Sequence, residues 1–120
     1  LLPPFGTILS KMIPLSAVLE LCMTAQPVTA QRAYDMGFLN KVVPGESLME
    51  EAMGMAEQIA ENAPLAVQYF KELAYRSLNM STQDISSLTS HMYDQLLTTE
   101  DSKEGPLAFA EKRKPNWKAK

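Results

Sequence analysis

The sequence has a single cysteine, Cys22, and a single histidine, His91, among its 120 residues. One thiol excludes a disulfide framework within a chain, and the scarcity of both residue types excludes the usual zinc sites. We therefore expect no bound metal. Because Cys22 stands between Leu21 and Met23 on an apolar stretch, we expect a buried and inert thiol.

Long apolar runs are also missing. None approaches the ~20 residues that a membrane-spanning helix needs, so no membrane span is predicted. The first residues lack an initiator Met and the basic end and apolar run of a secretion signal. We interpret Leu1 as the cut edge of a longer protein. Without disulfide cysteines or a secretion signal, an intracellular location is expected, cytoplasmic or, in a eukaryote, mitochondrial.

The charge is distributed unevenly. Composition is that of an ordinary soluble globular protein of one domain, with 46% apolar and 21% charged residues and a net charge of -3. Residues 112–120 carry five basic side chains and no acidic one, whereas the rest carries 6 basic and 14 acidic ones. A basic end on an acidic body favours an anionic partner such as phosphate, although a solvated tail explains the same pattern. Nucleic acid is not expected, because the tail has one aromatic residue and the acidic body would repel a polyanion.

Apolar spacing predicts helices nearly throughout. The first follows Pro14 and ends before Pro27. Its expected apolar face is Leu15, Val18, Leu19 and Cys22. Thr29 is a plausible N-cap for a short helix through Met36, with Gly37 in the left-handed position of a C-cap. Residues 38–43 then predict the one short strand, which Pro44-Gly45 ends.

Three longer helices follow. Ser47 and Glu50 form a capping box before a helix that ends near Asn62, with an apolar stripe at Leu48, Ala52, Met55, Ala56 and Ile59. Pro64 begins the next helix. Ser81 or Thr82 caps a long helix whose buried side is expected at Ile85, Leu88, Met92, Leu96 and Tyr93. Asp101 and Glu104 resemble a second capping box that opens the last helix, so the chain is predicted to be mainly α.

No acid–base pair is evident. The glutamates of the predicted helices fall at solvent-facing positions, and no carboxylate spacing singles out His91. Ser86, Ser87 and Ser90 lack a partner base. No residue of this chain is therefore predicted to be catalytic.

The last twenty residues carry the most specific pattern. Its fixed positions are Asp101, Glu104, Gly105, Ala108, Phe109, Glu111, Lys112, Arg113, Pro115 and Trp117. Their spacing resembles the C-terminal signature of the crotonase family, the enoyl-CoA hydratases and isomerases, which runs close to D-x-x-E-G-x-x-A-F-x-E-K-R-x-P-x-F/W.

A second segment, residues 17–44, is similar to the same family. Its matching positions are Ala17, Leu19, Leu21, Thr24, Thr29, Ala30, Ala33, Gly37, Phe38, Leu39, Val42, Val43 and Pro44. Pro64-Leu65-Ala66-Val67 and Lys71 agree between the two segments, so the resemblance covers essentially the whole chain. Two segments in the right order are more specific than either alone.

Three positions depart from the family pattern. Ala25 replaces the glycine usual after Thr24, and Arg32 stands where relatives often have the Glu of a capping box. Both changes concern helix ends. Phe5-Gly6 stands where relatives generally have paired glycines in a loop bordering the acyl pocket. Phe5 is therefore a candidate acyl-pocket residue that would narrow or reshape that pocket.

The resemblance implies that residues 1–120 are a single C-terminal helical region of an α/β crotonase (ClpP/crotonase-like) fold, which contributes oligomer contacts and part of the coenzyme A site. It implies a hydratase- or isomerase-type enzyme of fatty acid metabolism that acts on acyl-CoA thioesters, with coenzyme A as part of the substrate and no separate cofactor. The catalytic residues are expected upstream of Leu1, in the N-terminal spiral domain that this chain lacks. Homo-oligomers, commonly trimers or pairs of trimers, are also implied.

The resemblance also implies ligand-holding residues. Lys112 matches the tail lysine that approaches the phosphates of coenzyme A, and Phe109 and Tyr93 match aromatic positions that flank the nucleotide. A core position for Phe109 and a solvated charge at Lys112 are the alternatives. Two other functions stay open for the chain: a non-catalytic helical interaction module, and a phosphate- or nucleic-acid-binding tail on a helical body.

Overall fold

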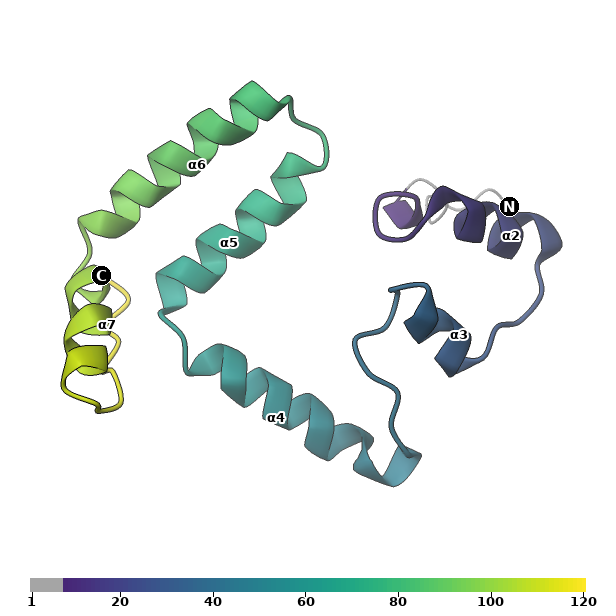
Figure 1. Ribbon diagram of the computed structural model, residues 1–120, viewed down its shortest axis with the longest axis horizontal. Helices are drawn as coiled ribbons and strands as arrows, with labels where there is room; N and C mark the ends of the chain where they lie inside the picture. Colours follow the sequence, from purple (N-terminus) through teal and green to yellow (C-terminus); the bar gives the residue numbers. More distant parts are fainter. Residues whose placement is uncertain (1–7) are drawn as a thin grey trace. The chain divides into compact units, whose positions relative to one another are not determined.

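The computed structural model describes residues 8–120 and divides the chain into two compact units, Leu1–Met49 and Glu50–Lys120 (Figure 1). We describe each unit by itself. Phe5 lies outside the described residues. The expectation of a single region over residues 1–120 stays a prediction.

Helix α2, Leu15–Thr24, follows Pro14, as expected. It ends at Ala25, whose φ of 51° is left-handed and whose N–H donates to the carbonyl of Leu21. Alanine replaces the usual glycine at position 25, so a residue with a Cβ adopts the backbone conformation that glycine adopts most easily.

The core of this unit consists of Ile13, Ala17, Val18 and Met36, with Leu9 and Leu21 partly buried against them. The predicted apolar face of α2 is wrong except for Val18, because Leu15, Leu19 and Cys22 are exposed. The buried face is rotated toward Ala17 and Leu21, so Cys22 is not the buried thiol that was expected.

Helix α3, Ala30–Asp35, confirms both predicted caps. The Thr29 hydroxyl accepts the N–H of Arg32 at 3.1 Å. Gly37, at φ 80°, donates its N–H to Tyr34, and the Phe38 N–H reaches the carbonyl of Ala33, which is the Schellman arrangement. The helix ends at Asp35, one residue earlier than predicted.

The predicted strand at residues 38–43 is wrong. No strand occurs within residues 8–120. A strand needs a second strand to complete its backbone hydrogen bonds, and the described chain offers none here. Phe38, Leu39 and Val42 leave much of their side chains exposed.

A short 3₁₀ turn, η1 over Gly45–Ser47, leads into α4, Leu48–Ala60. The Ser47 N–H donates to the carbonyl of Pro44 as part of this turn, so the turn takes the place of the predicted capping box. The apolar stripe of α4 exists, but no residue of α4 is buried.

Helices α5, Pro64–Ser77, and α6, Thr82–Leu97, lie side by side in the second unit (Figure 1). Pro64 is the first residue of α5, as predicted. Ser81 caps α6 by accepting the N–H of Asp84 at 3.2 Å. On the predicted inner side of α6, Met92 is buried, and Ile85, Leu88 and Leu96 are half-buried. Tyr93 is the exception, with 60% of its surface exposed.

The last helix, α7, covers Asp101–Ala110. Thr99 caps its first turn, since its hydroxyl accepts the N–H of Ser102 at 3.2 Å. The predicted Asp101–Glu104 capping box is wrong, because both carboxylates bind backbone groups of the C-terminal tail instead.

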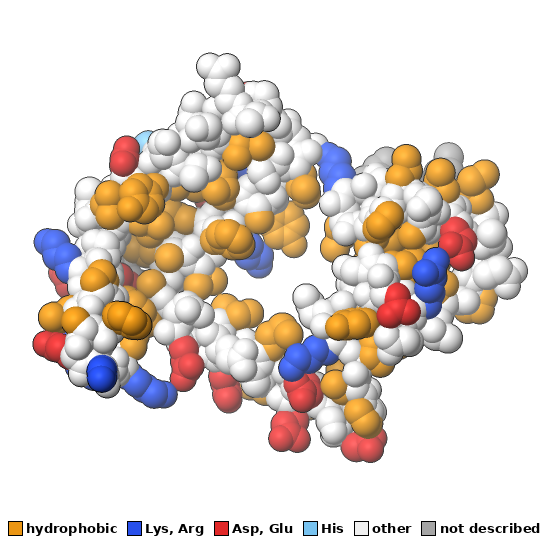
Figure 2. All heavy atoms as spheres, viewed as in Figure 1, with side chains coloured by type: hydrophobic (Ala, Val, Ile, Leu, Met, Phe, Trp, Pro, Cys, Tyr) orange, Lys and Arg blue, Asp and Glu red, His pale blue; other side chains and the backbone are white. Residues whose placement is uncertain are grey.

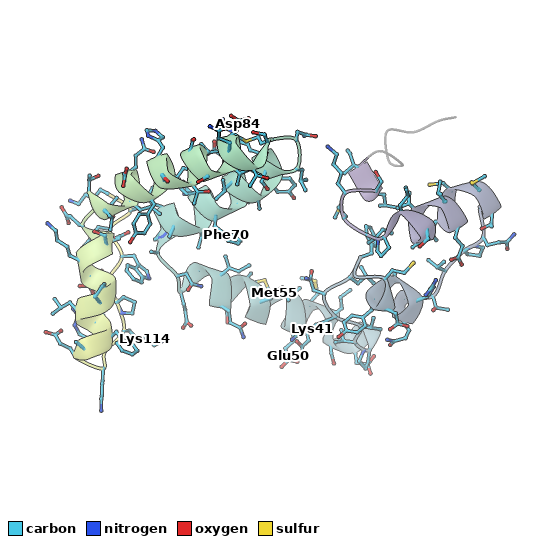
Figure 3. The ribbon with its side chains drawn as sticks, turned by 45° about the horizontal axis from the view of Figure 1, so that its top comes forward. Lys41, Glu50, Met55, Phe70, Asp84 and Lys114 are labelled. Atoms are coloured by element: carbon cyan, nitrogen blue, oxygen red, sulfur yellow. The ribbon has the colours of Figure 1, made fainter. Side chains whose placement is uncertain are left out.

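Large apolar side chains are exposed over the second unit. Figure 2 shows hydrophobic surface at several places on the face in view. They are Met53, Met55, Ile59, Phe70, Tyr75, Leu78, Tyr93, Leu97, Leu107 and Phe109. Met55 on α4 and Phe70 on α5 are labelled in Figure 3. The helices of this unit therefore leave large apolar side chains uncovered.

Candidate functional site

The C-terminal tail reverses direction directly after α7, and Lys112 forms the reversal. Its φ is 54°, in the left-handed region. The Lys112 N–H donates to the carbonyl of Phe109 at 3.2 Å, and the Arg113 N–H donates to that of Ala108 at 3.0 Å. These two bonds make a Schellman motif with a lysine in the position that glycine usually occupies.

The tail then wraps around the carboxylate of Glu104. Arg113 donates to it from both terminal guanidinium nitrogens, at 2.6 and 3.0 Å. The N–H of Asn116 donates to the same carboxylate at 2.7 Å. These bonds, first that of Arg113 and then that of Asn116, lower the pKa of Glu104 from 4.5 to about 2. The pKa of Arg113 is raised by the same pairing and by its bond to Glu111.

Asp101 holds the end of the tail. Its two carboxylate oxygens accept the N–H groups of Lys118 and Ala119 at 2.7 and 3.0 Å. Only 5% of Asp101 is exposed, which makes it the one buried charged residue among those the structure describes. Asp101 can be buried because each of its carboxylate oxygens accepts a hydrogen bond.

Trp117 connects the tail to the junction between α4 and α5. Its indole N–H donates to the carbonyl of Glu61 at 2.8 Å. Its ring lies against Gly105, where an added Cβ would come within 3.3 Å of the ring carbon Cη2. Lys114, labelled beside α7 in Figure 3, also pairs with Glu61, at 3.2 Å.

Several basic side chains of the tail are engaged by acidic groups of the same chain. Arg113, Lys114 and Lys120 pair with acidic side chains, and Lys118 lies close enough to Glu104 to lower its pKa. Within residues 8–120, Lys112 and Lys118 are the two tail cations that form no ion pair, and of these Lys112 lies at the turn. The five positive charges thus leave one exposed lysine at the turn.

The two aromatic candidates lie at different places. Phe109 is one turn before Lys112 at the end of α7 and is 87% exposed, so it is not part of a core within residues 8–120. Tyr93 lines an apolar hollow of about 260 Å³ between α5 and α6, together with Tyr69, Phe70, Leu73 and Met92. Lys112 and Phe109 are therefore neighbours, whereas Tyr93 belongs to the α5–α6 surface.

The described residues present no metal-binding cluster. No group of three His, Cys, Asp or Glu side chains among residues 8–120 is arranged to hold a metal ion. His91 is exposed on α6. None of the helices in the described ranges is long and apolar enough to span a membrane. The acyl-pocket role of Phe5 stays a prediction.

Comparison with protein families identifies the chain. The family model for enoyl-CoA hydratase/isomerase matches residues 2–120. The chain belongs to the enoyl-CoA hydratase/isomerase family. The match begins at residue 2, so membership rests on the chain's full length and not on the C-terminal pattern alone.

Curated relatives in this enoyl-CoA hydratase/isomerase family are similar over nearly the whole chain. The carnitinyl-CoA dehydratase of Proteus mirabilis is 40% identical over 116 residues, which are 93% of this chain and 44% of that protein. The carnitinyl-CoA dehydratase of Salmonella arizonae is 40% identical over 114 residues, or 92% and 44%. The chain thus spans less than half the length of these relatives.

Solved structures share the fold. An enoyl-CoA hydratase from Bacillus anthracis matches with a TM-score of 0.92 and 32% identity over 96% of this chain and 45% of its own. One from Mycobacterium tuberculosis matches with a TM-score of 0.91 and 31% identity over 97% and 46%. The helical arrangement is therefore that of part of an enoyl-CoA hydratase/isomerase-family protein.

Sequence reasoning singled out Lys112 as a candidate but missed the residues that shape its turn. Asp101 and Glu104 were interpreted as local caps, and Arg113 as one of five similar charges. Glycine at position 105 followed by tryptophan twelve residues later was the available signal, since a glycine inside a helix marks a close approach.

Proposed function

We propose that this chain is the C-terminal helical region of an enzyme acting on acyl-CoA thioesters, and that it supplies part of the coenzyme A site. The observation that carries the proposal is Lys112, an exposed lysine without an acidic partner in residues 8–120, placed beside the exposed ring of Phe109. An ammonium pairs with phosphate as a point charge, and an aromatic face can stack on adenine. Tyr93 would contribute a second aromatic contact from the α5–α6 surface.

The chemistry is proposed to belong to the remainder of the protein. Hydration or isomerisation of an enoyl thioester needs two backbone N–H donors for the developing oxyanion, worth about 3 kcal/mol each, and carboxylates that move protons. The acids of the described chain form structural pairs with the tail or lie at the surface. A hydratase, dehydratase or isomerase activity agrees with the names of the relatives, and we place the catalytic acids upstream of Leu1.

Oligomer contacts are the second proposed role. Side chains as large as Phe70, Tyr75 and Leu97 are more than half exposed. Apolar surface of this kind marks a contact with further protein. We propose that these faces meet the missing half of the fold and neighbouring subunits of a homo-oligomer, a trimer or a pair of trimers.

Coenzyme A titration tests the ligand role. Calorimetry with coenzyme A should give a measurable affinity for the chain, and Lys112→Ala should weaken it about tenfold, as expected for loss of one hydrogen bond to a charged group. Lys71→Ala is the matched control, because it removes the same charge from an exposed position on α5. Equal affinity of the Lys112→Ala variant and the parent chain would reject the proposal.

A non-catalytic interaction module is the alternative, favoured by the exposed apolar side chains of the described helices. The two functions differ in the activity of the complete protein toward enoyl-CoA thioesters. Turnover supports the enzyme, and coenzyme A binding to the complete protein without turnover supports the module.

A further inference from the structure

The lysine at the turn has a conformation that its sequence does not favour. Left-handed backbone is disfavoured for residues with a Cβ, and glycine is the usual occupant of this position. Lys112 nevertheless has a φ of 54°. The two backbone bonds of the Schellman motif can be exchanged for water at any exposed helix end, so further contacts must stabilise this turn.

Those contacts converge on Glu104. Its carboxylate binds Arg113, the residue after Lys112, through two hydrogen bonds, and it also accepts the N–H of Asn116. Glu104 thereby fixes both ends of the four-residue segment that follows Lys112. With 19% of its side chain exposed, it is also better shielded from water than the other paired glutamates.

The same pairing removes Arg113 as an anion ligand. Its terminal nitrogens bind Glu104, its Nε binds Glu111, and Nη1 also reaches the carbonyl of Lys114. A phosphate would have to compete with two carboxylates for this guanidinium. Lys112, one residue earlier, has no such competitor among the described residues.

We propose that Glu104 and Arg113 are positioning residues, whose two-bond ion pair holds the Lys112 turn so that the lysine presents its ammonium to the phosphates of coenzyme A. This inference rests on the proposed function of Lys112. It assigns the arginine of the tail a structural task and leaves the lysine as the ligand. The ion pair raises affinity by keeping the binding-competent turn populated.

A double-mutant cycle tests the assignment. Coenzyme A affinity is measured for the chain, for Glu104→Gln, for Lys112→Ala and for both together. Glu104→Gln keeps an acceptor for Asn116 but removes the charge. It should weaken binding roughly three- to tenfold when Lys112 is present, and by less than a factor of two in the Lys112→Ala background.

Two further variants distinguish a positioning role of the ion pair from a general effect of net charge or folding on coenzyme A affinity. Arg113→Lys preserves the net charge but loses the two-bond geometry, so it should also weaken binding severalfold. Glu72→Gln is the matched control, because Glu72 forms an exposed pair with Arg76 on α5, at 2.8 Å, and should leave affinity unchanged. Circular dichroism and Trp117 fluorescence on each sample establish that helices and tail remain in place.

The outcomes are distinguishable. If Lys112→Ala weakens binding and Glu104→Gln does not, the positioning role is rejected and the function proposed for Lys112 stands. The same conclusion follows if Glu104→Gln weakens binding equally in both backgrounds. If Lys112→Ala has no effect, both the proposed function and the positioning role are overturned.

Discussion

The indole N–H of Trp117 donates to the backbone carbonyl of Glu61, 56 positions earlier in the chain. Glu61 directly follows α4, and the carbonyls at the end of a helix lack partners within it. Trp117 therefore satisfies an acceptor that the helix cannot, and it fastens the end of the chain to the α4–α5 junction.

Trp117→Phe tests this fastening. Phenylalanine retains an aromatic ring against Gly105 but has no donor for the carbonyl of Glu61. We expect the free energy of unfolding to fall by about 1 kcal/mol, the usual net value of one hydrogen bond. Urea unfolding followed by circular dichroism measures it. Tyr75→Phe, at a residue that is 67% exposed, should leave the value unchanged, and equal effects would contradict the prediction.

A pair of glycine variants tests the contact between Gly105 and Trp117. Both Gly54 and Gly105 lie inside helices, where alanine is favoured by about 1 kcal/mol. A Cβ at Gly54 meets nothing within 4 Å, whereas one at Gly105 comes within 3.3 Å of the Trp117 ring. Gly54→Ala should therefore stabilise the chain by about 1 kcal/mol, and Gly105→Ala by clearly less.

Trp117 fluorescence supplies the second measurement for this pair. Because it is the sole tryptophan, its emission reports only on the tail. Gly105→Ala should shift the emission to longer wavelength or lower its anisotropy, and Gly54→Ala should change neither. Equal stabilisation with identical emission would show that the ring does not need the space that glycine leaves.

Helix ends were predictable where the signal is local. Thr29, Gly37 and Ser81 each act within three or four residues of their own position, so the sequence pattern contains all that is needed. Pro64 begins α5 for an equally local reason. The fold family was predicted from the resemblance of the C-terminal residues and of residues 17–44 to a known family pattern.

The partners of the α7 carboxylates and the buried face of α2 were not predictable, because they depend on contacts that residue spacing does not encode. Asp101 and Glu104 fit a capping box, but tail groups 9 to 18 residues away bind their carboxylates. Leu15 and Cys22 fit a buried stripe. An apolar stripe indicates only that a helix face is covered, and it does not indicate which part of the protein covers it. The chain spans less than half the length of its relatives, and several large apolar side chains are exposed.

Ala25→Gly tests the departure from the family pattern. Ala25 ends α2 at a φ of 51°, where a Cβ is unfavourable and glycine is not. We expect the variant to be more stable by about 0.5–1 kcal/mol, after allowing for the greater flexibility of glycine in the unfolded chain. Ala56→Gly, inside α4, is the control and should destabilise by about 1 kcal/mol. Loss of stability in Ala25→Gly would contradict the assigned backbone conformation.

The attachment of the C-terminal tail to α7 should depend on pH, because the ionised carboxylate of Glu104 holds the tail. Its pKa is lowered from 4.5 to about 2, chiefly by the hydrogen bonds of Arg113 and then by that of Asn116. A carboxyl group whose pKa is lowered in the docked state favours docking fully above pH 4.5, and this contribution is lost as the pH falls toward 2. Trp117 emission recorded between these pH values should therefore shift progressively toward that of a solvent-exposed indole.

Glu104→Gln isolates this titration from those of the other carboxylates. Without an ionisable group at position 104, the tail should be held less firmly at neutral pH, and its emission should change much less between pH 4.5 and 2. Glu72→Gln removes a glutamate from an exposed pair on α5 and should reproduce the parent profile. An unchanged acid transition in Glu104→Gln would show that Glu104 does not control it.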